Sequence, residues 1–237
     1  QGVKKLAIHV FTDGRDTPPQ SASAYINELE NVLKEFGPNY FIATISGRYY
    51  AMDRDNNWDR LAKVEQAMFE CKGNVCEISP SLYLKDQYKV GKKDELLEPI
   101  VCTNLDGNGC AIKENDAVFF FNFRADRARM LSEKMMDKKD LKNLLFITLT
   151  EYCKDFTCQI VFPPMAVKTT LGEQISKAGL KQAHIAETEK FAHATYFLNG
   201  GREKPYDGEV DILLNSRKDI KTHDEAPEMR AEGIADK

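Results

Sequence analysis

Five arginines follow three apolar segments of this sequence, each close to the point where the segment ends. They are Arg15, Arg48, Arg54, Arg124 and Arg127. A guanidinium group can bind carboxylate or phosphate oxygens through two parallel hydrogen bonds. Because the carboxyl ends of parallel strands share one edge of a sheet, we expect these side chains to converge on one cleft. Taken singly, each is more often a surface or ion-paired residue, but the repeated placement favours a site for a small, multiply charged anion.

The loop at 11–19 combines Arg15 with an acidic neighbour, Asp16. Gly14 permits a tight turn, and Pro18-Pro19 stiffens the exit of the loop. Asp16 stays ionised beside arginines and can orient or deprotonate a substrate hydroxyl. The alternative interpretation is that Asp16 only neutralises Arg15.

Strand-like and helix-like segments alternate along the first two thirds of the chain. The hydrophobic patterns predict strands at 5–11, 41–45, 117–123 and 144–149. They predict helices at 20–36, 58–70, 79–88 and 124–136. This alternation indicates an α/β fold, a three-layer α/β/α domain built on a parallel sheet. The first helix is expected to bury Tyr25, Leu29, Val32, Leu33 and Phe36.

The segment 117–123 is the most apolar predicted strand, and its unbroken apolar character predicts the central strand of the sheet. It leads directly into Arg124, where the following helix is expected to begin. Arg124 and Arg127 are three residues apart, so this helix would present both on one face. Its N-terminus would add to the attraction for an anion.

A double proline, Pro163-Pro164, follows a strand and predicts a domain boundary. Beyond it, Thr170 begins a capping box of a helix that Gly179 ends. Short strands are expected at 183–186 and 212–214, and residues after Ser216 are expected to be loop-like. Lys190 lies beyond the strand at 183–186. By its charge it is a candidate phosphate contact, although an ordinary solvated lysine is the commoner case.

Composition limits the classes of partner. The chain has 237 residues, 42% of them hydrophobic, and a net charge of −4. This charge argues against a general attraction to nucleic acid or to an anionic membrane. No apolar run reaches membrane-spanning length, and the six cysteines lack Cys-x-x-Cys spacing, so free thiols in the cytosol are expected. Since the sequence starts at Gln1 and ends in a polar stretch, we expect a fragment of a longer protein.

Four segments of the sequence resemble cofactor-independent (2,3-bisphosphoglycerate-independent) phosphoglycerate mutases. They are His-Val-Phe-Thr-Asp-Gly-Arg-Asp-Thr-Pro-Pro at 9–19, Ser-Gly-Arg-Tyr-Tyr-Ala-Met-Asp-Arg-Asp at 46–55, Phe-Asn-Phe-Arg-Ala-Asp-Arg at 121–127 and Ile-Ala-Glu-Thr-Glu-Lys-Phe-Ala-His at 185–193. These motifs are long, occur in the family's order and extend over most of the chain.

The resemblance implies an isomerase of glycolysis that interconverts 3-phosphoglycerate and 2-phosphoglycerate through a phosphoserine intermediate. It implies an inserted glycerate-binding (phosphotransferase) domain at 1–161 and part of an alkaline-phosphatase-like catalytic domain at 165–237. It also implies two Mn²⁺ ions. We expect a cytoplasmic monomer that binds this small substrate and neither nucleic acid nor membrane.

Residue roles carry over from the matching motifs. The resemblance implies that the five arginines hold the carboxylate and phosphate of the substrate. Asp16 would contact the glycerate hydroxyls and assist their proton transfer, and Lys190 would offset charge on the transferred phosphoryl group. The substrate-binding residues are thus Arg15, Asp16, Arg48, Arg54, Arg124, Arg127 and Lys190, with Asp16 and Lys190 also catalytic.

The departures from the family are also informative. The family's phosphorylated serine and its metal ligands are expected outside this chain, so no metal ligand is assigned here and the chain alone is expected to be inactive. Arg217 and His223 replace residues that are usually Pro and Tyr, and little consequence is expected. Two alternatives remain: an inactive module that binds phospho-carboxylates, and a sugar-phosphate mutase of the alkaline phosphatase superfamily.

Overall fold

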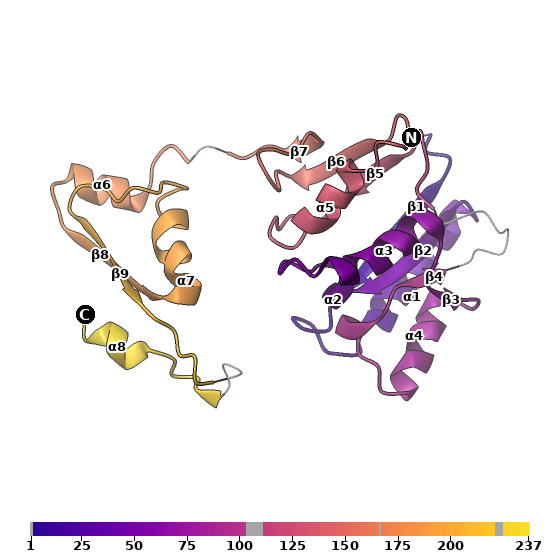
Figure 1. Ribbon diagram of the computed structural model, residues 1–237, viewed down its shortest axis with the longest axis horizontal. Coiled ribbons are helices and arrows are strands. Elements are labelled where there is room, and N and C mark those ends of the chain that lie inside the picture. Colours follow the sequence, from indigo (N-terminus) through magenta and orange to yellow (C-terminus); the bar gives the residue numbers. More distant parts are fainter. Residues whose placement is uncertain (1, 103–110, 166, 221–224) are drawn as a thin grey trace. The chain divides into compact units, whose positions relative to one another are not determined.

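The computed structural model describes residues 2–102, 111–165, 167–220 and 225–237. Within them the chain forms two compact units, Gln1–Pro164 and Met165–Lys237, and each is described here by itself. Both units combine strands with helices, as Figure 1 shows, so the predicted α/β class is confirmed. The turn that the Gly/Asn-rich residues 106–109 predict lies outside the described residues, as does His223, considered above.

The first unit contains a four-stranded sheet with the strand order β1-β2-β4-β3. Its strands are β1 (Leu6–Thr12), β2 (Tyr40–Gly47), β3 (Asn74–Cys76) and β4 (Ile100–Cys102). Its longer helices are α1 (Ala22–Phe36), α3 (Trp58–Glu70) and α4 (Pro80–Lys89). The strands predicted at 5–11 and 41–45 are therefore confirmed. The sheet is mixed, because β2 pairs in parallel with β1 but antiparallel with β4.

The inward face of α1 differs from the prediction. Ala22, Ile26 and Leu33 are buried, whereas Tyr25 and Val32 are exposed. Residues spaced by four and seven positions lie on one side of a helix, so Ala22, Ile26 and Leu33 form one stripe. The predicted set mixed this stripe with the adjacent exposed face.

The three strands of a second sheet in this unit are all parallel, in the order β5-β6-β7. They are β5 (Ala117–Phe120), β6 (Leu145–Thr150) and β7 (Gln159–Phe162), with helix α5 (Arg129–Met136) between the first two. The prediction of a central strand at 117–123 is wrong, because β5 is an edge strand that ends at Phe120. Phe121 and Phe123 are each 73% exposed. The hydroxyl of Tyr152 donates to the carbonyls of Phe120 and Asn122, which ties the end of the strand to the loop after β6.

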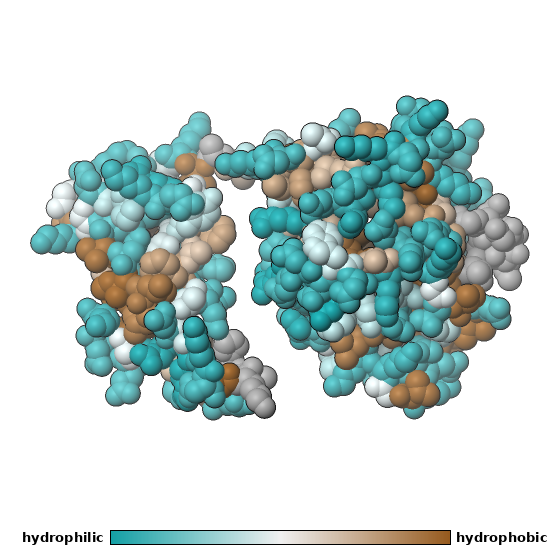
Figure 2. Space-filling view, viewed as in Figure 1, coloured by the Kyte–Doolittle hydropathy of each residue, from teal (hydrophilic) through white to brown (hydrophobic). Residues whose placement is uncertain are grey.

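The second unit is built around the parallel pair β8 (Gln182–Glu187) and β9 (Glu209–Leu214). Its helices are α6 (Leu171–Lys177), α7 (Thr188–Ala192), a π-helical turn at His193–Phe197 and α8 (Ala231–Ala235). The predicted cap is confirmed, because the amide of Glu173 donates to Thr170 Oγ1 over 3.2 Å. The prediction that residues after Ser216 are only loop-like is wrong, since α8 lies there. Figure 2 shows hydrophobic residues gathered over this strand pair, where Val210 and Leu213 are exposed.

Two further sequence expectations concern the cysteines and the membrane. Cys102, Cys153 and Cys158 are free thiols, but Cys71 is disulfide-bonded, so the prediction of free thiols throughout is wrong. The spacing of cysteines along a sequence does not report which of them meet in space. Among the described residues, no helix combines the length and the apolar character that crossing a membrane requires.

Candidate anion-binding site

The loop after β1 is held in shape by its own short polar side chains. Asp13 Oδ1 accepts hydrogen bonds from the backbone amides of Arg15 and Asp16, both over 3.3 Å. Gly14 has a φ of +67°, and a Cβ there would lie 2.8 Å from both Asp94 Cβ and the amide nitrogen of Glu95. This turn therefore requires glycine for its conformation and for the close approach of the short helix η1 (Asp94–Leu96).

The same helix supports the loop after β2. The amide of Gly47 donates to the carbonyl of Leu97 over 2.8 Å, and a Cβ at Gly47 would lie 2.4 Å from the carbonyl oxygen of Glu95. Arg48 follows as the first residue of α2 (Arg48–Ala51). The backbone around η1 thus sets the position from which the Arg48 side chain starts.

Arg48 is the buried arginine of the group, with 8% of its side chain exposed. Its Nη1 lies 2.5 Å from Asp13 Oδ1 and 2.8 Å from Asp16 Oδ2. Burial acts to lower the pKa of Arg48, but the hydrogen bonds and charges of Asp16 and Asp13 outweigh it and raise that pKa above its ordinary value. Arg48 is therefore a fixed cation with two carboxylates on one nitrogen.

Neither Arg124 nor Arg127 lies in a helix, because α5 begins only at Arg129; Arg127 lies in a turn, and Arg124 directly precedes it. The amides of Ala128 and Arg129 both donate to the carbonyl of Ala125, which forms this turn before the helix. The prediction that the two arginines share the first face of a helix is therefore wrong. Both still remain at the carboxyl end of β5.

The turn carries an acid that connects two arginines. Arg54 Nη1 lies 3.1 Å from Asp126 Oδ2, and Arg124 Nε lies 3.7 Å from Asp126 Oδ1. Arg127 instead donates from Nη1 to the carbonyl of Met52 over 2.9 Å. Through these contacts, the turn before α5 meets the segment that follows α2.

The electrostatics of Arg127 report that the arginines converge. Its pKa is lowered first by burial and then by the positive charges of Arg48, Arg54 and Arg15. Repulsion of this kind requires the groups to be near one another, so four arginines from three separate segments act on a common region. Arg124 joins them through the acid it shares with Arg54.

The loop after β1 also places its two predicted site residues at the surface. Arg15 Nη2 forms an ion pair with Glu95 Oε1 over 2.7 Å, with 54% of the Arg15 side chain exposed. Asp16 is 68% exposed apart from its contact with Arg48. Both side chains can therefore reach a ligand that arrives from solvent.

The acids that balance the arginines were missed as site residues. They are Asp13, Glu95 and Asp126. Asp13 and Asp126 lie inside the recognised motifs, two residues from an arginine, and that spacing was an available signal. Nothing in the sequence near Glu95 indicates a partner 80 positions earlier.

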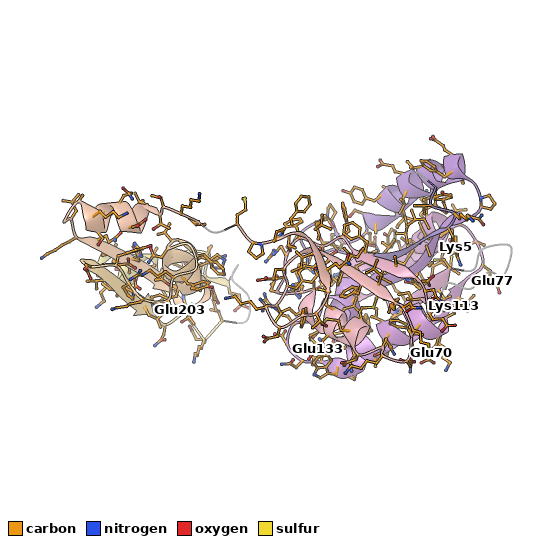
Figure 3. The ribbon with its side chains drawn as sticks, turned by 90° about the horizontal axis from the view of Figure 1, so that it is seen from above. Lys5, Glu70, Glu77, Lys113, Glu133 and Glu203 are labelled. Carbon is orange, nitrogen blue, oxygen red and sulfur yellow. The ribbon has the colours of Figure 1, made fainter. Side chains whose placement is uncertain are left out.

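Two features lie apart from this arginine group. A cavity of about 890 Å³ runs between β1 and β5, and residues such as Phe11, Val118 and Leu131 line it, while none of the predicted site arginines does. Figure 3 labels charged side chains on the exterior, among them Glu70 and Glu133 on the first unit. These exposed acids contribute to the negative net charge, so the positive site is a local feature.

The remaining predicted site residue belongs to the second unit. Lys190 is exposed in α7 of that unit. Its predicted role with the arginines of the first unit stays a prediction.

A divalent cation does not suit the arginine group, because positive charges dominate it. Elsewhere in the described residues, the second unit has one His/Asp/Glu group whose ligand atoms lie close enough together to hold a metal ion. It consists of His184, Glu209 and Asp211.

Comparison with known sequences identifies the first unit. Residues 1–154 match the sequence family described as "BPG-independent PGAM N-terminus". The chain is 42% identical to the 2,3-bisphosphoglycerate-independent phosphoglycerate mutase of Syntrophotalea carbinolica over 243 residues, which cover 99% of this chain and 46% of that protein. It is 43% identical to the enzyme of the same name from Listeria innocua over 247 residues, covering 100% of this chain and 48% of that protein. The chain therefore spans about half the length of these relatives.

A solved structure agrees with this assignment. The phosphoglycerate mutase of Leishmania mexicana, determined at low cobalt concentration, superposes with a TM-score of 0.68 at 25% sequence identity. The match covers 99% of this chain and 46% of that one. Motifs, sequence comparison and fold thus agree, and the chain belongs to the family of 2,3-bisphosphoglycerate-independent phosphoglycerate mutases.

Proposed function

We propose that this chain is part of an isomerase that interconverts 3-phosphoglycerate and 2-phosphoglycerate in glycolysis. Residues 1–161 would be its inserted glycerate-binding (phosphotransferase) domain, and residues 165–237 part of its alkaline-phosphatase-like domain. The family matched by residues 1–154 and the names of the relatives support the proposal. A cytoplasmic location and a monomeric state are proposed with it.

The convergence of arginines in the first unit is the observation that carries this proposal. Arg127 is electrostatically coupled to Arg15, Arg48 and Arg54 in a chain whose net charge is −4. A phosphoglycerate carries a carboxylate and a phosphate, and both groups match the forked donors of arginine. Glu95 and Asp126 now occupy the exposed donors of Arg15 and Arg54, and a ligand with several negative charges can displace these acids.

The proposed reaction consists of two phosphoryl transfers, the first from the C3 oxygen of the substrate and the second to its C2 oxygen. In the first transfer a serine oxygen loses its proton and bonds to phosphorus, while the bond from phosphorus to the C3 oxygen breaks and that oxygen takes up a proton. After the retained glycerate reorients, the C2 hydroxyl loses its proton and its oxygen bonds to phosphorus, while the bond from phosphorus to the serine oxygen breaks and the serine is protonated again. Asp16 would assist these proton transfers, because its carboxylate is exposed and held beside Arg48.

The arginines and Lys190 would act on the substrate's charged groups. The arginines would retain the glycerate while it turns, and Lys190 would offset charge on the transferred phosphoryl group. The serine and the ligands of two Mn²⁺ ions are proposed to lie outside this chain.

Calorimetry of the chain with 3-phosphoglycerate tests the proposal. We expect salt-sensitive binding at one site, weakened about 10- to 100-fold by Arg127→Ala, which removes a charge-assisted contact. Arg202→Ala is the matched control, because this exposed arginine of the second unit loses the same charge elsewhere. Inorganic phosphate and glycerate should each bind more weakly than the whole substrate.

Other outcomes separate the alternatives. If Arg127→Ala and Arg202→Ala weakened the binding of 3-phosphoglycerate equally, the loss would reflect only the change in net charge, and the proposed site would be rejected. Tighter binding of a sugar phosphate than of 3-phosphoglycerate would favour a sugar-phosphate mutase. Turnover to 2-phosphoglycerate by the chain alone would contradict the placement of the serine outside it.

A further inference from the structure

Three potential metal ligands face one another across the strand pair of the second unit. His184 in β8 lies directly opposite Asp211 in β9, and Glu209 lies two residues before Asp211. Alternate residues of a strand share a face of the sheet, so all three side chains lie on the same side. His184 Nδ1 lies 3.3 Å from Glu209 Oε1 and 3.5 Å from Asp211 Oδ1.

This cluster is largely buried, and two of its polar atoms make no hydrogen bond. The exposed fractions of the His184, Asp211 and Glu209 side chains are 10%, 18% and 0%. Neither His184 Nδ1 nor Asp211 Oδ1 makes a hydrogen bond, although each is sealed from solvent. An unsatisfied buried polar group costs about 1–3 kcal/mol, and an ion bound between the two atoms would remove that cost.

The charge of the cluster also favours a cation. Glu209 and Asp211 place two neighbouring carboxylates beside one imidazole. Neighbouring buried carboxylates repel each other unless a positive charge or a shared proton lies between or beside them. A divalent ion supplies that charge and the missing contacts at once.

Hydrogen bonds from residues outside the cluster fix the position of the Glu209 carboxylate. Asn199 Nδ2 donates to Glu209 Oε1 over 2.6 Å, and the amide of Tyr206 donates to Oε2 over 3.1 Å. Hydrogen bonds of this kind orient ligating carboxylates in metal sites. They leave further lone pairs on both oxygens for an ion.

We propose that His184, Glu209 and Asp211 bind one divalent transition-metal ion. With bonds of about 2.0–2.1 Å, neighbouring ligands of a tetrahedral site are about 3.3–3.4 Å apart, close to the two distances measured from Nδ1. One imidazole and two carboxylates suit Mn²⁺, Co²⁺ or Zn²⁺ better than Ca²⁺ or Cu⁺. The ion would connect β8 and β9 through the ligands that each strand carries. This inference does not depend on the proposed function.

Titration of the chelator-treated full chain with Mn²⁺, Co²⁺ and Zn²⁺ tests the proposal by calorimetry, and Co²⁺ adds a visible absorption spectrum. We expect one equivalent to bind, with ligand-field bands of low coordination number for Co²⁺. His184→Gln and Asp211→Asn should each weaken binding at least tenfold. Asp207→Asn is the matched control, because this exposed acid lies just before β9 and should change nothing.

Nitrogen NMR of the unaltered chain provides a readout that does not depend on folded variants. Of the four histidine rings, that of His184 should shift at Nδ1 when Zn²⁺ is added. An unshifted His184 ring at saturating Zn²⁺ would overturn the proposal. Binding that is unchanged in both His184→Gln and Asp211→Asn would overturn it as well, since the ions would then occupy surface acids.

Discussion

Replacing Asp94 by alanine is expected to destabilise the first unit more than any change at a surface acid. This carboxylate is fully buried. Its Oδ2 accepts hydrogen bonds from the amides of Ser21 and Ala22 over 2.8 and 2.9 Å, at the start of α1. Its Oδ1 accepts from the hydroxyl of Tyr88 in α4 over 2.5 Å. Asp94 thus joins η1 to the beginning of one helix and the end of another.

The magnitude follows from the donors that would remain. Loss of a helix cap costs about 0.5–2 kcal/mol, and each buried donor left without a partner costs about 1–3 kcal/mol. Since these costs overlap, we expect Asp94→Ala to lower the free energy of unfolding by about 3–5 kcal/mol, below the full sum for three donors left without a partner. Asp94→Asn keeps one acceptor and should cost less, as should Tyr88→Phe.

Urea unfolding followed by tryptophan fluorescence measures this change. Trp58 is the single tryptophan and lies at the start of α3, so its signal reports on the first unit. With a slope of about 2 kcal/mol per molar urea, the midpoint should fall by about 1.5–2.5 M. Asp86→Ala is the control, because this half-exposed acid of α4 makes only a surface ion pair with Lys89.

Two results would refute the reasoning. A midpoint for Asp94→Ala within 0.5 M (about 1 kcal/mol) of the unaltered chain, at the same slope, would mean that the buried contacts contribute little. An equal shift in Asp86→Ala would mean that the loss of any acid in this region has the same effect.

Two further predictions concern pH and packing. Burial lowers the pKa of His9 to about 4, so the unfolded state takes up a proton at higher pH than the folded state. Stability of the first unit should therefore fall as pH decreases from about 6.5 to about 4, by up to about 3 kcal/mol, and His9→Gln should remove this slope in unfolding curves. Gly47→Ala places a Cβ against backbone 2.4 Å away and should cost about 1–3 kcal/mol in urea unfolding. A smaller loss than in Gly91→Ala, where only a positive φ opposes the methyl group, would contradict the packing argument.

Much of the first unit could be predicted from the sequence, because its strands and loops are marked by residues that are neighbours along the chain. The apolar runs of β1, β2 and β6 are short and end in polar residues, and Arg15 and Arg48 follow the ends of the first two. The cap at Thr170 was predictable for the same reason, since donor and acceptor are three residues apart. These features depend on neighbours along the chain.

The remaining features depend on contacts that the sequence does not display. The edge position of β5 reflects which strands pair, and its apolar run looked like that of a central strand. Arg124 was expected at the start of a helix because it directly follows the apolar run, yet a turn at Ala125 delays the helix to Arg129. The partners Glu95 and Asp94 reach the loop after β1 from 80 positions away, and the His184 cluster forms only through the register of β8 with β9.

The close approach of η1 to the loop after β1 also has a consequence during synthesis on the ribosome. Thr12 donates to the carbonyl of Asp94, which lies 82 residues later in the chain. At about 5–20 residues per second, this partner is made about 4–16 s after Thr12. Arg15 is present for nearly all of that interval, and Arg48 for its later part, without the helix that supports their loops. Arg124 and Arg127 are made only after η1, so a nascent chain exposes the first arginines of the candidate anion-binding site before it can hold them in position.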